Sequence, residues 1–186
     1  MTARRLVSRL QRRRKPGWRV VLLDECHARL FPTRAPQCAK RGHYPEIPLS
    51  DRHGKCAVFG AADLHSGRVF HHLARSLSGA EQLVLLEQVA AAYPDERVLQ
   101  VWDNGPTHRN RRVQEWLAQH QQVVCFWLPP YCGADVNPIE HCWRWFREHV
   151  THNHLFESVE QLMDAAHEFF REVASHGPAV LRGARE

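Results

Sequence analysis

Two stretches decide the fold: Arg19-Val-Val-Leu-Leu-Asp24 and Val98-Leu-Gln-Val-Trp-Asp103. Each is a short apolar run, the pattern of a strand buried on both faces of a sheet. Each run ends at an aspartate. In open α/β sheets, ligands gather outside the carboxyl ends of the strands. The two stretches therefore predict a sheet with two acids at one edge.

A third acid, Glu140, opens an expected helix. It lies in Asn137-Pro-Ile-Glu140-His-Cys-Trp143, after the turn-rich stretch Pro129-Pro-Tyr-Cys-Gly-Ala-Asp-Val136. Clustered carboxylates repel one another unless a cation neutralises them. Acidic oxygen ligands suit Mg²⁺ or Mn²⁺, and paired ions of that kind drive phosphodiester chemistry. The three acids together predict a metal site.

Each acid also has an ordinary structural interpretation. Asp24 can begin a turn after a strand, and Asp103 stands in the turn sequence Asp103-Asn-Gly-Pro106. Glu140 lies three residues after Asn137 and can complete a capping box. Taken together the acids favour one site, because all three fall where the chain leaves a strand or enters a helix.

The other segments predict an α/β fold class with a mixed five-stranded sheet flanked by helices. Consecutive strands suit an antiparallel meander, whereas the later strand–helix units need parallel crossovers. Further strands are expected at 55–64, 68–74 and 123–128, helices at 78–93, 109–120, 137–150 and 158–174, and an extended loop at 31–51. The expected apolar helix stripes are Leu83, Leu86, Ala90, Tyr93; Val113, Trp116, Leu117; Ile139, Cys142, Trp143, Phe146, Val150; and Val159, Leu162, Ala166, Phe169, Val173.

Composition favours one globular core in the cytoplasm. The chain has 186 residues, of which 44% are hydrophobic. It has no apolar stretch long enough to span a bilayer, and its basic N-terminus lacks the apolar segment of a secretory signal. None of the six cysteines forms a CxxC pair, so we expect reduced, buried thiols rather than disulfides or zinc ligands.

Positive charge gathers at the N-terminus. Residues 1–19 hold eight of the 25 basic residues and no acid, so the rest carries 17 basic and 20 acidic residues, a net charge of −3. Such an arm is expected to contact nucleic-acid phosphates with strong salt dependence. The alternative is a solvated arm that only aids solubility.

The motifs together resemble the catalytic region of DDE transposases of the mariner superfamily, particularly the bacterial insertion-sequence branch called six-thirty. The resemblance covers about Val20 to Phe170. It rests on Leu23-Asp24-Glu25, Gly60-Ala-Ala-Asp-Leu64, Asp103-Asn104 with His108, Leu128-Pro-Pro-Tyr131, and Asn137-Pro-Ile-Glu140 with Trp143. The order of these motifs is more specific than any one of them.

The resemblance implies a ribonuclease-H-like fold in which Asp24, Asp103 and Glu140 are the catalytic, metal-binding triad. It implies two Mg²⁺ (or Mn²⁺) ions, cleavage at a transposon end, and attack of the freed 3′-hydroxyl on target DNA. Asn104 and His108 are candidates to orient the scissile phosphate or a metal-bound water, or to cap the following helix. Glu25 should face away from the metals and bond a neighbouring backbone or basic group. Trp143 is assigned to the core.

We expect three segments: a basic arm at 1–19, the catalytic domain at 20–175 and a C-terminal tail at 176–186. DNA contacts are expected from Arg12, Arg13, Arg14, Lys15, Arg34, Lys40 and Arg41. Complete members of the family carry an N-terminal helix-turn-helix region that 19 residues cannot hold, so a separate helix-turn-helix product of the same element or a truncated copy is expected. The expected partners are transposon-end and target DNA and a second copy of the chain, with no membrane.

Two other functions remain open from the sequence. One is a stand-alone ribonuclease-H-like nuclease, which would cut strands without joining them. The other is a non-catalytic DNA-binding remnant, acting as an accessory subunit of a full-length transposase.

Overall fold

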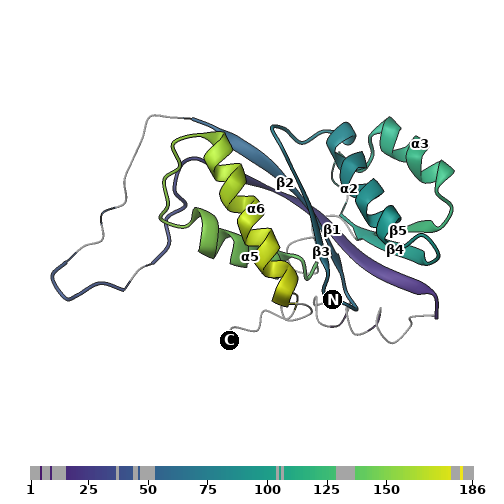
Figure 1. Cartoon of the computed structure of the whole chain (residues 1–186), viewed down its shortest axis with the longest axis horizontal. Coiled ribbons are helices and arrows are strands. Elements are labelled where there is room, and N and C mark those ends of the chain that lie inside the picture. Colours follow the sequence, from purple (N-terminus) through teal and green to yellow (C-terminus); the bar gives the residue numbers. More distant parts are fainter. Residues whose placement is uncertain are drawn as a thin grey trace.

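The fold is built on one mixed sheet (Figure 1). The computed structural model describes residues 5, 9, 16–36, 38–43, 46, 53–103, 105, 107–128, 137–176 and 181. Within them five strands lie in the order β3-β2-β1-β4-β5. They are β1 (Trp18–Arg29), β2 (Lys55–Asp63), β3 (Val69–Ala74), β4 (Arg97–Trp102) and β5 (Val123–Trp127). The expected mixed five-stranded sheet is confirmed.

Strand β1 lies at the centre and joins two kinds of pairing. It runs antiparallel to β2, which runs antiparallel to β3. It runs parallel to β4, which runs parallel to β5. The meander and the two crossovers expected from the element order are therefore both present.

Both faces of the central strand are covered. Alternate residues of β1 enter two separate apolar cores, because successive side chains of a strand point to opposite faces. Val20 and Leu22 belong to the core shared with α5 (Glu140–Phe146) and α6 (Val159–His176). Val21 and Leu23 belong to the core shared with α2 (Gly79–Ala92) and α3 (Arg111–Gln119). Figure 1 shows α6 beside α5 and apart from α2 and α3.

The helix starts follow local capping chemistry. Ser78 caps α2 by accepting a hydrogen bond from the backbone N–H of Glu81, as its capping-box sequence predicts. Asn110 caps α3, so the capping role considered for Asn104 and His108 is wrong for His108. The buried face of α2 contains Leu85 and Val89, whereas Leu83 and Ala90 of the expected stripe are only partly buried.

The structure corrects the expectations for the end of β1, for the extent of the basic arm and for the burial of Cys38. Strand β1 continues five residues past Asp24, because its antiparallel pairing with β2 extends from Val21 to Arg29. Asp24 therefore begins no turn and does not end the strand. Arg19 belongs to β1 and not to a free arm. Cys38 is exposed, unlike the buried Cys56 and Cys142.

The expected helix at 137–150 is shorter and changes its pitch. Asn137 is not its N-cap; α5 begins at Glu140, and the capping position falls at Ile139 without a side-chain cap. After Phe146 the chain continues as a π-helix, η1 (Arg147–Thr151). The apolar stripe of this helix is nevertheless buried as expected: Ile139, Cys142, Trp143, Phe146 and Val150.

The first residues after β1 are tied to the segment after η1. Thr33 forms a bridge with His152. Asn153 accepts a hydrogen bond from the Ala35 N–H and donates one to the Ala35 carbonyl, both at 3.1 Å. None of the helices among the described residues is long and apolar enough to cross a membrane.

Asp63 organises the turn between β2 and β3. Its buried carboxylate accepts hydrogen bonds from the Ser66 hydroxyl and the Tyr93 hydroxyl, both at 2.8 Å, and from the His65 N–H at 2.7 Å. Burial alone would raise the pKa of Asp63, but these hydrogen bonds outweigh it and lower the pKa below its usual value.

Asp63→Ala should therefore destabilise the fold by about 2–4 kcal/mol at pH 7, because it strands the buried Tyr93 hydroxyl and the turn N–H groups. Chemical denaturation measures this. A carboxylate with a lowered folded pKa stabilises the protein above its unfolded pKa, and this stability is lost as the pH falls through the folded value. The difference from wild type should shrink below about pH 4. Asp95→Ala, at an exposed turn residue, is the matched control; equal losses would contradict this role for Asp63.

Candidate metal centre

Asp24 lies on the central strand, directly opposite Gly60 of β2. Alternation along β1 places Asp24 on the face of Leu22, toward α5 and α6, and Glu25 on the face of Leu23, toward α2 and α3. The two neighbouring acids therefore have different partners. Glu25 points away from Asp24, but the expectation that it faces away from the metal-binding acids is wrong for Asp103, whose ligand atoms lie within 4.8 Å of those of Glu25 and His108.

Trp143 of α5 contacts Asp24 through its one polar atom. The indole Nε1–H donates a hydrogen bond to Asp24 Oδ2 at 3.0 Å. The benzene ring of the indole packs over Gly60, where an added Cβ would lie 2.4 Å from Cη2. The assignment of Trp143 to the core is right, since the residue is 1% exposed, but the pattern missed its contact with Asp24. A glycine inside a strand often marks a place where another group approaches the backbone closely. Gly60 could therefore have indicated this contact.

The Asp24 carboxyl is hard to ionise in this environment. Burial raises its pKa to about 7, the hydrogen bond from Trp143 opposes the rise, and the negative charges of Glu140 and Glu25 add to it. Burial also raises the pKa of Glu140, while Arg147 and Arg144 counteract it. Asp24 and Glu140 are therefore close enough to repel each other, as expected for two members of one acidic site.

Asn137 fixes the start of α5 against β1. Its side-chain amide donates a hydrogen bond to the backbone carbonyl of Leu23 at 2.9 Å, and its Oδ1 accepts one from the Ile139 N–H at 3.3 Å. The residue is buried. It thus ties the turn that precedes Glu140 to the residue before Asp24.

Asp103 follows β4 immediately, next to the central strand. The parallel pairing of β1 and β4 ends with Leu22 opposite Val101, two residues before Asp24 and Asp103 respectively. Asp103 Oδ1 accepts a hydrogen bond from the Gly105 N–H at 2.8 Å and lies 3.1 Å from His108 Nε2. Chiefly through His108, the pKa of Asp103 is held below its usual value.

His108 joins Asp103 to Glu25. The same Nε2 lies 3.3 Å from Glu25 Oε2, and Thr107 donates a hydrogen bond to the other oxygen of Glu25 at 2.9 Å. Burial lowers the pKa of His108, but the two carboxylates outweigh it and raise the pKa to about 9. His108 is therefore charged at neutral pH. The expected basic partner of Glu25 is this histidine.

The predicted site residues thus fall into two contact groups. Asp24 is hydrogen-bonded to Trp143 and feels the charge of Glu140, whereas Asp103 and Glu25 share His108. Ligand atoms of Glu25, Asp103 and His108 all lie within 4.8 Å of one another, and this is the one such group among the described residues. The triad of Asp24, Asp103 and Glu140 stays a prediction. Arg34, Lys40 and Arg41 are exposed, and Asn104, Arg12, Arg13, Arg14 and Lys15 lie outside the described residues.

The donor set fits divalent cations. Carboxylate oxygens from β1, from the residue after β4 and from α5 are hard ligands of the kind Mg²⁺ and Mn²⁺ prefer. The pKa values of Asp24 and Glu140 are raised chiefly by burial, so their negative charges are costly without neutralisation. A cation would supply that neutralisation.

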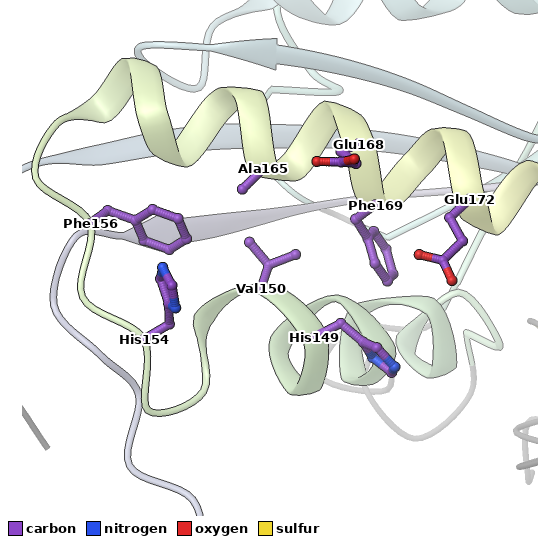
Figure 2. A pocket seen from close by; sticks show the side chains of 8 residues that line it. All are labelled: His149, Val150, His154, Phe156, Ala165, Glu168, Phe169 and Glu172. Carbon is purple, nitrogen blue, oxygen red and sulfur yellow. The ribbon is translucent and has the colours of Figure 1, made fainter. Parts of the chain in front are cut away.

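A separate pocket lies between η1 and α6 (Figure 2). It has a volume of about 270 Å³, and His149, His154, Glu168 and Glu172 are among its lining residues. None of the predicted site residues that the structure describes lines it. The candidate metal centre is therefore not this pocket.

Comparison with solved structures identifies the class of fold. The Mos1 mariner paired-end complex with Mn is similar with a TM-score of 0.67 at 21% identity, over 97% of this chain and 56% of that chain. The catalytic domain of Mos1 mariner transposase gives a TM-score of 0.56 at 18% identity, over 97% of this chain and 86% of that chain. The predicted ribonuclease-H-like fold is confirmed.

The chain belongs to the DDE superfamily endonuclease family, which it matches over residues 19–163. It is 26% identical over 152 residues to the insertion element IS630 uncharacterized 39 kDa protein of Shigella sonnei. That match covers 81% of this chain and 44% of the relative, so the chain spans less than half of the relative's length. The predicted resemblance to mariner-superfamily transposases of the six-thirty branch is confirmed.

Asp24→Asn should stabilise the metal-free protein at pH 8 by roughly 1–3 kcal/mol, since it removes a carboxylate that is costly to ionise. A group with a raised folded pKa loses stability as the pH rises from its unfolded value to its folded value, here from 3.8 to about 7. The gain should therefore be absent near pH 4, grow up to pH 7 and then level off. Thermal denaturation in chelator across this range measures it. A gain that does not vary with pH would contradict the raised pKa.

Proposed function

We propose that this chain is the catalytic domain of a transposase that cuts DNA strands and joins them to target DNA with the help of divalent cations. The observation that carries the proposal is the half-buried carboxylate of Asp24 on the central strand, which accepts a hydrogen bond from Trp143 and whose pKa is raised by burial and by the charge of Glu140. Asp103 follows the neighbouring strand β4, and Glu140 begins the helix whose start is tied to β1 by Asn137, which supports a shared role for the three acids. Membership of the DDE endonuclease family supports the same function.

In this proposal Asp24, Asp103 and Glu140 hold the ions, two in number, and Mg²⁺ or Mn²⁺ fits their oxygen ligands. The bound ions would lower the pKa of the attacking water or 3′-hydroxyl and neutralise charge on the phosphate. The protein's own residues do the positioning. Gly105 and His108 orient the Asp103 carboxylate, and Asn137 holds the start of the helix that carries Glu140.

We assign His108 to positioning rather than to contact with DNA. Its side chain is fully buried and lies between two carboxylates. Its ring packs 4.5 Å from that of Trp102, measured between ring centroids. A buried, charged imidazole can hold Asp103 and Glu25 but cannot reach a phosphate in solvent. Asn104 remains the candidate for orienting the phosphate.

DNA is the proposed substrate. Relatives of the same fold were solved as Mos1 complexes, one of them with the left transposon end. In this chain Arg34, Lys40 and Arg41 are exposed, and the anchoring of Thr33 and Ala35 to the segment after η1 gives Arg34 a defined place. We further propose that a dimer forms on DNA and that a separate helix-turn-helix product supplies recognition of the ends.

Asp103→Asn should reduce metal-dependent nicking of supercoiled DNA by at least about 100-fold, because the substitution removes one charged ligand while keeping the side chain's shape. Gel assays with Mn²⁺ measure nicking, and circular dichroism checks the fold. The exposed Asp95→Asn variant is the control and should nick like wild type. Undiminished nicking by Asp103→Asn would contradict the triad.

The same assay separates the two rival functions. A stand-alone nuclease would nick DNA but would not join a 3′-hydroxyl oligonucleotide to plasmid DNA. A non-catalytic remnant would do neither with any divalent metal. We expect both activities from the wild-type chain.

A triple variant with alanine at Arg34, Lys40 and Arg41 should bind DNA more weakly. The slope of log K against log salt concentration should become shallower by about 0.9 for each lost phosphate contact. Fluorescence anisotropy over a series of salt concentrations measures both quantities. Removing residues 1–15 should have the same kind of effect. The control is Arg68→Ala with Arg97→Ala, which are exposed at the far end of the sheet, at the β2–β3 turn and the start of β4. An unchanged salt slope in the triple variant would contradict the proposed contact.

A further inference from the structure

We propose that Trp143 is a positioning residue for Asp24 and that the lack of a side chain at Gly60 makes room for its indole ring. The inference rests on the proposed function, in which Asp24 holds a metal ion. It adds that the indole N–H fixes the orientation of the carboxylate before an ion arrives. Trp143 then contributes to the metal site, and its packing in the apolar core holds the indole N–H in position.

The first support is the position of Trp143 on its helix. It follows Glu140 by three residues in α5, and residues three apart lie on the same face of a helix. One helix face thus presents a carboxylate and an N–H donor to the same strand. The Nε1–H reaches Asp24 Oδ2 at 3.0 Å, while the charge of Glu140 acts on the same carboxyl.

The second support is the backbone beneath the indole. Gly60 is the residue of β2 that pairs directly with Asp24. A Cβ at this position would lie 2.4 Å from Cη2 and 2.9 Å from Cζ2 of Trp143, well inside contact distance. No side chain larger than that of glycine is compatible with the present place of the ring. The missing side chain at Gly60 therefore leaves the space in which the Trp143 indole lies close enough to donate its N–H to Asp24.

The third support is a contrast with another buried tryptophan. Trp102 is as completely buried as Trp143, yet its Nε1 has no hydrogen-bond partner among the described residues. Burial of an indole in this fold does not by itself bring its N–H to a carboxylate. A partner that orients a metal ligand is worth about 10–100-fold in metal affinity in known sites, which sets the size of the expected effect.

The direct test is Trp143→Phe in the full chain, which keeps an aromatic ring and removes the donor. Titration calorimetry and electron paramagnetic resonance would measure Mn²⁺ binding. We expect affinity to fall about 10–100-fold. Nicking should recover at high Mn²⁺, so the metal concentration for half-maximal activity rises more than the maximal rate falls. Trp116→Phe, in the apolar core on the opposite face of the sheet, is the matched control and should bind Mn²⁺ like wild type.

Two further measurements, one on the wild-type protein and one on Gly60→Ala alone, do not depend on how well Trp143→Phe folds. In wild-type protein labelled with ¹⁵N-tryptophan, the indole N–H signal that shifts most on Mg²⁺ addition should be that of Trp143. Gly60→Ala should weaken Mn²⁺ binding as well, because it displaces the ring from Asp24. Its effect should be smaller when combined with Trp143→Phe, since a phenyl ring leaves much of the space over residue 60 empty.

The outcomes separate this inference from the proposed function. Unchanged Mn²⁺ affinity in folded Trp143→Phe, or an equal loss in Trp116→Phe, overturns the positioning role alone. An indole signal of Trp143 that does not respond to Mg²⁺ in a wild-type protein that binds the ion also overturns it. Failure of the wild-type chain to bind Mn²⁺ or to nick DNA overturns the proposed function, and the inference with it.

Discussion

The structure depends on the pairing of β1 with a different partner on each side. Antiparallel β2 runs along most of the strand, whereas parallel β4 accompanies only its first half. Asp24 lies just beyond the point where the parallel pairing ends. The strand is still held by β2 there, whereas β4 ends at Trp102 and Asp103 follows it. Asp24 and Asp103 therefore both lie just past the end of the parallel pairing between β1 and β4.

The acids are tolerated for different reasons. Asp103 and Glu25 share a charged imidazole, which serves as a built-in cation. Asp24 has neutral donors, the indole N–H of Trp143 and a backbone N–H, and the charge of Glu140 acts on it. The half of the site around Asp24 is therefore electrostatically less satisfied and takes up a proton near neutral pH. Carboxyl groups with pKa values raised by burial and by neighbouring charges are common at functional sites, where some stability is given up for the chemistry.

Much of this arrangement was predictable from the sequence. The apolar run ending at Trp102 located β4 correctly, because a strand buried on both faces has few polar residues. The true end of β1 was not predictable, since its second half is polar and stays extended only through pairing with β2. Alternation predicted that Glu25 turns away from Asp24, but its meeting with Asp103 depends on the path of the chain to His108. Trp143 fitted the apolar stripe of its helix, and such a pattern does not show where a single N–H points.

The π-helix that follows α5 has a mechanical consequence. Glu140 begins the helix, and the turn of η1 at its other end delivers His152 to Thr33 and Asn153 to Ala35. The exposed Arg34 lies between those two anchored residues. The helix thus acts as a strut, with the acid at one end and a cationic loop at the other. Glu140 and the exposed Arg34 are therefore held at opposite ends of one continuous helical segment, Glu140–Thr151.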